Sequence, residues 1–206
     1  MQEKDPVWIW MSAAFALAAA IAACVLAVRG TGPRAINVAL FTTARWSFLL
    51  FWLAYAGGGL AVLLGPVAQP IARHGREFAL SFAAAHLVHV GLVVWLCLIG
   101  AAPSWDLVYF FVPPLLVLYV IALASIPTLH KKLTRPVWRI LRTGGMSYIA
   151  YAFGADFLAN PFSRDSKHII LYAPFALMTV TGPLLHLLWL MSPLWHERRK
   201  GRRPSP

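Results

Sequence analysis

The stretch FALSFAAAHLVHVGLVVWLCLIG, residues 78–100, decides the fold. It contains no Asp, Glu, Lys or Arg, although Arg76 and Glu77 stand directly before it. A helix needs about 20 apolar residues to cross the hydrocarbon layer of a bilayer. We therefore expect this stretch to form a transmembrane helix, with its two histidines inside the membrane.

Five further apolar blocks lie on either side of this stretch. They are residues 7–28, 46–64, 107–129, 143–159 and 169–191. The block at 143–159 is the shortest and contains Gly144, Gly145 and Gly154, but small residues are common where transmembrane helices pack closely. The intervals between blocks are too short to hold a soluble domain. The sequence therefore predicts an all-α, six-helix transmembrane bundle that forms one domain over residues 1–206.

The composition supports a membrane protein. Of the 206 residues, 60% are hydrophobic and only 12% are charged, whereas a soluble domain carries roughly 25% charged residues. The net charge of +11 comes from residues between the apolar blocks and in the tail at 195–206, so no separate basic domain remains that could bind nucleic acid. Cys24 and Cys97 lie inside apolar blocks and indicate neither a disulfide framework nor a zinc site. The expected partner is the lipid bilayer.

The Lys and Arg residues predict the orientation, because cytoplasmic loops carry an excess of them. Six crossings divide these residues into a set of thirteen and a set of five. The thirteen are Lys4, Arg73, Arg76, Lys131, Lys132, Arg135, Arg139, Arg142, Arg198, Arg199, Lys200, Arg202 and Arg203, and the five are Arg29, Arg34, Arg45, Arg164 and Lys167. Both termini are therefore expected in the cytoplasm (N-in/C-in), and the protein in the cell inner (plasma) membrane.

Three histidines inside the apolar blocks are candidate functional residues, because ionisable groups are costly in a bilayer. His86 and His89 are three residues apart and share one helix face. His186 lies in the last block, six residues before Ser192, which is about 9 Å from that cytoplasmic end at 1.5 Å per residue. Neutral imidazole can ligate haem iron, so His186 with either His86 or His89 is a candidate ligand pair for haem b. In the alternative interpretation, each histidine hydrogen-bonds to a neighbouring helix.

Three stretches resemble the ferric-reductase-like transmembrane domain, over roughly residues 40–160. They are Arg76-Glu77-Phe78-Ala79-Leu80 followed by His89, Ala122-Leu123-Ala124-Ser125, and Trp138-Arg139-Ile140-Leu141-Arg142 running on to Tyr148. Within that family, the chain is most similar to the haem-bearing membrane subunit of the bacterial periplasmic methionine sulfoxide reductase system. The resemblance implies a haem b protein in which His89 ligates the iron.

The chain departs from that family in its fifth helix, which supplies haem histidines. Here the first such position is Arg142, and the second falls at about Ala155. Only His89 carries over, so its partner on the iron would be His186, outside the family pattern.

The charged residues near the ends of the block at 143–159 have two interpretations each. In a haem protein Arg139 and Arg142 would pair with propionates through their planar guanidinium groups, and otherwise they contact lipid headgroups. Asp156 is either a proton or cation site or an interfacial carboxylate held by water or by Arg164.

We carry three functional hypotheses. In the first, a haem b subunit of an oxidoreductase passes electrons across the bilayer to a separate redox partner, since the chain has no flavin or NAD domain. The alternative is a haem-free membrane scaffold or partner subunit of the same fold. The third, a small transporter, lacks the internal repeats that transporters often show. Two facing histidines at one depth would favour electron transfer, and histidines in separate places would favour the scaffold.

Overall fold

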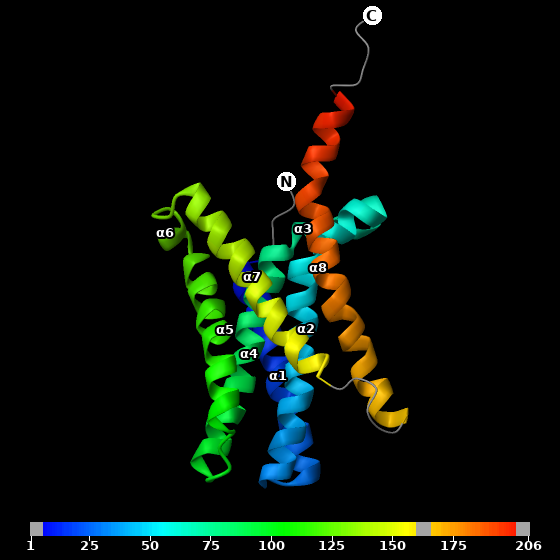
Figure 1. The fold of residues 1–206 in the computed structure, drawn as a ribbon. Helices are drawn as coiled ribbons and strands as arrows, with labels where there is room; N and C mark the ends of the chain where they lie inside the picture. The colour runs from blue at the N-terminus through cyan, green and yellow to red at the C-terminus, as the bar shows by residue number, and fades with distance from the viewer. Residues whose placement is uncertain (1–5, 160–165, 201–206) are drawn as a thin grey trace, which may run out of the picture.

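Helices joined by short loops make up the described residues. The computed structural model describes residues 6–159 and 166–200, and it describes side chains at 6–126, 128–159 and 169–192. No strand occurs among these residues (Figure 1). The helices are α1 (Val7–Arg29), α2 (Pro33–Leu64), η1 (Gly65–Ala68), α3 (Gln69–Arg73), α4 (Gly75–Leu98), α5 (Trp105–Ala124), α6 (Pro127–His130), α7 (Arg135–Phe157) and α8 (Ser166–Lys200).

Five helices in the described part are long and apolar enough to cross a membrane. They are α1, α2 with the short helices after it, α4, α5 and residues 169–192 of α8. The chain is therefore a helical membrane protein, as the sequence predicts. Helix α7 is 23 residues long, but Arg135, Arg139 and Arg142 in its first turns lower its hydropathy below that of the other five.

Helix α2 begins earlier than expected. It starts at Pro33 instead of Trp46, because proline suits the first turn of a helix. Gly30 with φ 83° makes the preceding turn short, since glycine adopts positive φ without a steric cost. As a result Arg45, which the sequence placed in an external loop, lies inside α2 and is 9% exposed.

Two other boundaries also differ from the expectation. The block at 107–129 is divided, because α5 ends at Ala124 and the short α6 follows. Helix α8 continues past Met191 to Lys200, so the beginning of the expected basic tail is helical. The expected loop at 160–165, Lys4 and residues 201–206 lie outside the described residues.

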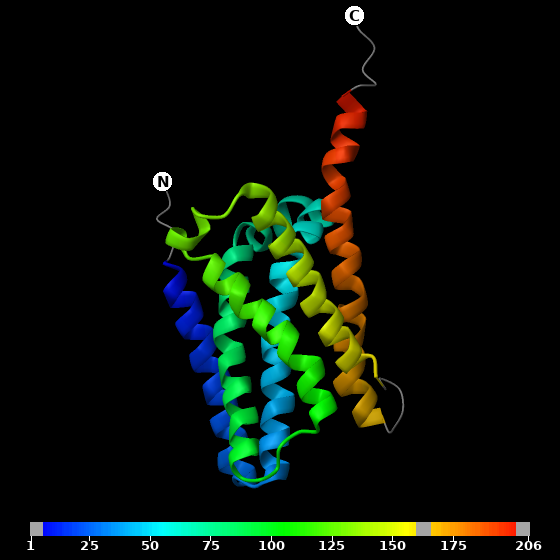
Figure 2. The ribbon, with the colours of Figure 1, turned by 60° about the vertical axis from the view of Figure 1, so that its left-hand side comes forward.

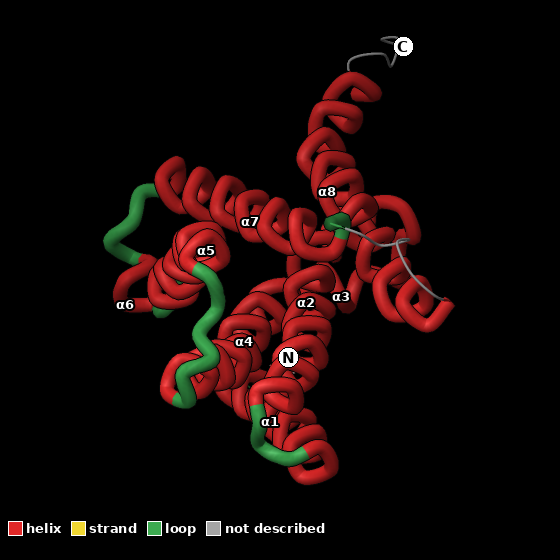
Figure 3. The backbone as a smooth tube through the Cα atoms, turned by 60° about the horizontal axis from the view of Figure 1, so that its bottom comes forward, coloured by secondary structure: helices red, strands yellow, loops and turns green. Residues whose placement is uncertain are grey.

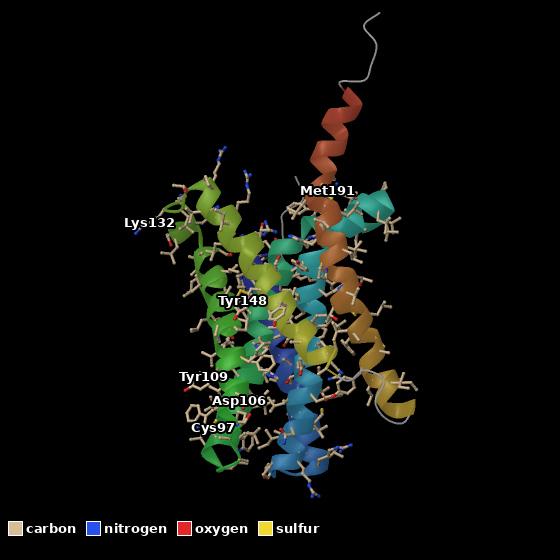
Figure 4. All side chains as sticks on the ribbon, in the orientation of Figure 1. Cys97, Asp106, Tyr109, Lys132, Tyr148 and Met191 are labelled. Atoms are coloured by element: carbon tan, nitrogen blue, oxygen red, sulfur yellow. The ribbon has the colours of Figure 1, made fainter. Side chains whose placement is uncertain are left out.

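The long helices run between the same two ends of the bundle (Figures 1 and 2). The start of α1 and the end of α8 lie at one end, which we call the terminal end. Lys132 and Met191 lie toward this end, and Cys97 and Asp106 lie toward the other (Figure 4). Helices α1, α2 and α4 pack together, α8 packs on α2, and α7 packs between α5 and α8 (Figure 3).

Phenylalanines fill the centre of the bundle. Phe48, Phe51 and Phe82, from α2 and α4, are each 1% exposed. Phe153 of α7 packs onto these three rings, with centroid distances of 4.9, 5.4 and 6.0 Å respectively. Large apolar rings of this kind provide most of the packing area in a core.

Gly58 and Gly59 let α8 approach α2 closely. A Cβ atom at Gly58 would lie 2.7 Å from the indole of Trp189, and one at Gly59 would overlap the backbone of Leu185. Close backbone approach at small residues is typical of transmembrane helix pairs. This approach fixes the register of α8 on α2 and therefore the position of His186.

Candidate functional site

His86 and His89 lie side by side on α4. Their rings stack with a centroid distance of 5.0 Å and an interplanar angle of 16°. The hydroxyl of Thr43 donates to the carbonyl of Ala39 at 2.9 Å and lies 3.3 Å from Nδ1 of His89. This contact joins α4 to α2 whichever of the two atoms donates the proton. His86 Nδ1 is buried and has no hydrogen-bond partner.

His186 lies on α8 against α2. Its Nδ1 is 3.1 Å from the carbonyl oxygen of Tyr55, and its ring stacks on the Tyr55 ring at 4.3 Å. A carbonyl only accepts, so Nδ1 carries the proton, and Nε2 of the neutral ring carries a lone pair. Nε2 is buried without a hydrogen-bond partner.

The structure does not bring His186 together with the other two histidines. His186 lies beside Tyr55, and His89 lies beside Thr43. Residues 43 and 55 are twelve positions apart on α2, which is about 18 Å at 1.5 Å per residue. His86 is nearly one turn closer than His89, which leaves about 13 Å along the helix axis.

A row of stacked rings occupies the interval between these positions. The centroid distances along it are 4.3, 5.4, 5.4, 5.5 and 5.0 Å, in the order His186, Tyr55, Phe51, Phe82, His86 and His89. Two axial nitrogens must reach the same iron atom, so neither His186 with His86 nor His186 with His89 fits a bis-histidine haem. The space between α4 and α7, where the family resemblance would set the haem, contains Phe82 and Phe153.

A cavity lies near the terminal end of the bundle. Its volume is about 320 Å³, and it is lined by residues from α2, the segment from α3 to the start of α4, the segment from α6 to α7, and α8. His186 and Arg142 both line it, together with Arg135, Arg139 and Trp138. The structure therefore brings together three of the five residues that the sequence predicted for a haem site, namely His186, Arg139 and Arg142. His86 and His89 do not line this cavity.

The cavity is cationic. No Asp or Glu is among its lining residues in the described part of the chain. Arg135, Arg139 and Arg142 form no hydrogen bond or ion pair with any residue whose side chain is described. Their charge therefore has no counter-charge among the described side chains.

Arg45 is a buried polar residue that the sequence interpretation missed. Its Nη1 donates to the carbonyl of Phe41 at 3.0 Å, and its Nε and Nη2 donate to the carbonyl of Leu171 at 3.3 and 3.2 Å. The guanidinium carbon lies 3.1 Å from the centroid of the Phe41 ring and 5.0 Å from that of Phe175. Arg45 therefore joins α2 to α8. A helix prediction extended back to Pro33 would have found it as a charge inside an apolar segment.

Other charged groups stand alone or lie at the surface. Glu77, also missed, is 6% exposed, and its Oε2 has no hydrogen-bond partner. Asp156 is exposed near the end of α7, with Arg45 as a charged neighbour. Its expected partner Arg164 lies outside the described residues. Among the described side chains, no three His, Cys, Asp or Glu gather as a metal site.

No protein family, curated protein or solved structure matches this chain. The resemblance to the ferric-reductase-like domain stays a prediction that rests on the three stretches of sequence.

Proposed function

We propose that this chain is a haem-independent membrane partner or scaffold subunit with the ferric-reductase-like fold. The observation that carries the proposal is the distance of about 13–18 Å along α2 between the levels of His186 and of the other two histidines. A haem that spans two helices needs two ligands at one depth, and the chain offers none on α7. Phenylalanines occupy the space between α4 and α7 instead.

The histidine contacts support packing roles without a cofactor. His89 bonds to Thr43 and so joins α4 to α2, and His186 bonds to Tyr55 and so joins α8 to α2. Interhelical hydrogen bonds of this kind are common in membrane bundles. Helix α2 is thus held on both sides, as expected for a scaffold built around one central helix.

We also propose that α7 is a sixth span and that both termini face the cytoplasm. A helix of 23 residues is about 34 Å long, enough to cross the hydrocarbon layer. Met146, Ile149 and Phe157 of α7 are buried against the bundle. In this arrangement the three arginines lie within about 10 Å of the first residue of α7, at the end of the helix that the excess of Lys and Arg assigns to the cytoplasm.

Reporter fusions test this topology. Fusions after Arg29, Asp106 and Asp165 are expected to report as external, and a fusion after Lys132 as cytoplasmic. A cytoplasmic signal after Asp165, with an external signal after Asp106, would remove α7 as a span.

A second candidate function, a haem b electron-transfer subunit, is favoured by one observation. The lone pair of His186 Nε2 is buried without a partner, and His186 lines a cavity that Arg139 and Arg142 also line. A histidine whose other nitrogen donates to a backbone carbonyl is a typical metal ligand. His186 would hold the iron from one side, and the two arginines would hold the propionates. The haem would supply the one-electron chemistry.

Titration of the purified protein with haemin separates the two functions. We expect no saturable complex with one haem per chain. A saturable complex that is lost in His186→Leu and kept in the matched control His86→Leu would establish the second function and overturn the first.

A further inference from the structure

The three cavity arginines lie on one face of α7. Arg135, Arg139 and Arg142 are spaced four and three residues apart, which brings their side chains together on a helix. Guanidinium groups bind phosphate through paired hydrogen bonds. Because these groups have no partner among the described side chains, the cavity is suited to an anionic phosphate group.

His186 adds a second requirement for the ligand. Its Nδ1–H is used by the carbonyl of Tyr55, so the neutral ring offers only an acceptor at Nε2. A buried acceptor without a partner costs free energy, and a hydroxyl group on the ligand would satisfy it. The cavity therefore fits a phosphate ester that carries a hydroxyl group nearby.

The surroundings favour a lipid over a soluble phosphate ester. Trp138 and Trp189 line the cavity, and indoles favour the membrane interface. Outside the cavity, Ile140 of α7 is 72% exposed and Leu184 of α8 is 61% exposed. Acyl chains could lie along these apolar residues, whereas a soluble ester would make no use of them. Basic pockets between transmembrane helices are known to bind the headgroups of anionic lipids.

We propose that this cavity binds the headgroup of an anionic phospholipid with a free hydroxyl, as in phosphatidylglycerol. The phosphate contacts the arginines of α7, and a glycerol hydroxyl donates to Nε2 of His186. This inference goes beyond the proposed function and does not depend on it, because the haemin titration and the lipid measurements give separate readouts.

The experiment measures lipid binding to the detergent-purified full chain by native mass spectrometry. The probes are short-chain phosphatidylglycerol, phosphatidic acid and phosphatidylcholine, with glycerol phosphate as the soluble arm. We expect phosphatidylglycerol to bind most tightly. Loss of one charge-assisted hydrogen bond weakens binding by about tenfold or more, so Arg142→Gln, and independently Arg139→Gln, should reduce phosphatidylglycerol binding by about that factor. Lys132→Gln removes one charge outside the cavity and is the matched control, expected to change binding less than about twofold.

His186→Phe tests the hydroxyl contact, because it keeps a flat ring against Tyr55 and removes Nε2. We expect this variant to bind phosphatidylglycerol no better than phosphatidic acid, while binding of phosphatidic acid is unchanged. His186→Gln, which restores an acceptor oxygen, should recover part of the preference. Thermal melting of each variant without lipid checks that the fold is kept.

Several results would overturn the proposal. Equal binding of phosphatidylglycerol and phosphatidylcholine by the wild type would exclude an anion site. If Lys132→Gln weakened phosphatidylglycerol binding as much as the two arginine variants do, binding would depend on overall surface charge and not on the cavity. Glycerol phosphate binding as tightly as phosphatidylglycerol would make the ligand a soluble phosphate ester. If His186→Phe still bound phosphatidylglycerol more tightly than phosphatidic acid, a hydroxyl contact to His186 would be excluded.

Discussion

Substitution of Gly59 by Ala tests the close approach of α8 to α2. A Cβ atom at Gly59 would overlap the backbone of Leu185. A backbone carbonyl cannot rotate away as a side chain can, so the two helices must move apart. This movement would also stretch the bond from Trp52 Nε1 to the carbonyl of Met178, which is 2.9 Å long.

The expected magnitude follows from three effects. Alanine is more favourable than glycine in a helix by about 1 kcal/mol. Overpacking costs about 1–3 kcal/mol, and an interhelical hydrogen bond in a membrane contributes about 0.6 kcal/mol. We expect Gly59→Ala to lower the free energy of unfolding by about 1–2 kcal/mol.

The matched control is Gly91→Ala in α4. A Cβ atom at Gly91 would meet no other atom within 4 Å, so the same substitution should leave the free energy of unfolding unchanged or raise it by up to about 1 kcal/mol. The measurement is reversible unfolding in mixed micelles with increasing dodecyl sulfate, followed by circular dichroism. Equal stability of the two variants would refute the packing explanation.

Three further predictions use the same unfolding measurement. Gly145→Ala should lower the free energy of unfolding less than Gly59→Ala does, because its Cβ would meet the flexible end of the Ile121 side chain at 2.5 Å. An equal loss of stability would show that the side chains of α5 cannot move aside. Arg45→Met removes the hydrogen bonds from the Arg45 guanidinium to the carbonyl of Leu171 in α8 and should lower the free energy of unfolding by about 1–3 kcal/mol, whereas the exposed Arg34→Met should change it by no more than about 0.5 kcal/mol. Similar values for both variants would contradict the bridging role of Arg45. His89→Phe should lower the free energy of unfolding by about 0.6 kcal/mol, because it removes the hydrogen bond to Thr43. His86→Phe should leave the free energy of unfolding unchanged or raise it, because the Nδ1 that it removes has no partner. A larger loss of stability in His86→Phe than in His89→Phe would contradict the contacts described for the two rings.

The membrane spans could be predicted from the sequence because hydrocarbon thickness fixes how many apolar residues a helix needs. The block at 78–100 corresponds to α4 within a few residues. The start of α2 was missed because Arg45 looked like a loop residue. Its charge is offset by two backbone carbonyls and aromatic rings, which are tertiary contacts that no local pattern shows.

The relation between the histidines also could not be predicted. Sequence position gives only a rough depth along each helix, so His186 could be paired with either His86 or His89. The actual level of His186 depends on how α8 slides along α2, and the contact between Gly59 and Leu185 determines it. Helix α8 also extends to Lys200, so the helix does not end at Ser192 and a depth counted from there has the wrong origin. The cavity that joins His186 to Arg142 is likewise a product of packing.

The most direct test of haem independence is the ratio of haem to protein in wild-type chain purified from haem-replete membranes. We expect a ratio near zero and no Soret band that shifts when dithionite is added. A ratio near one haem per chain, with a bis-histidine spectrum that disappears in both His89→Leu and His186→Leu, would contradict the proposed function.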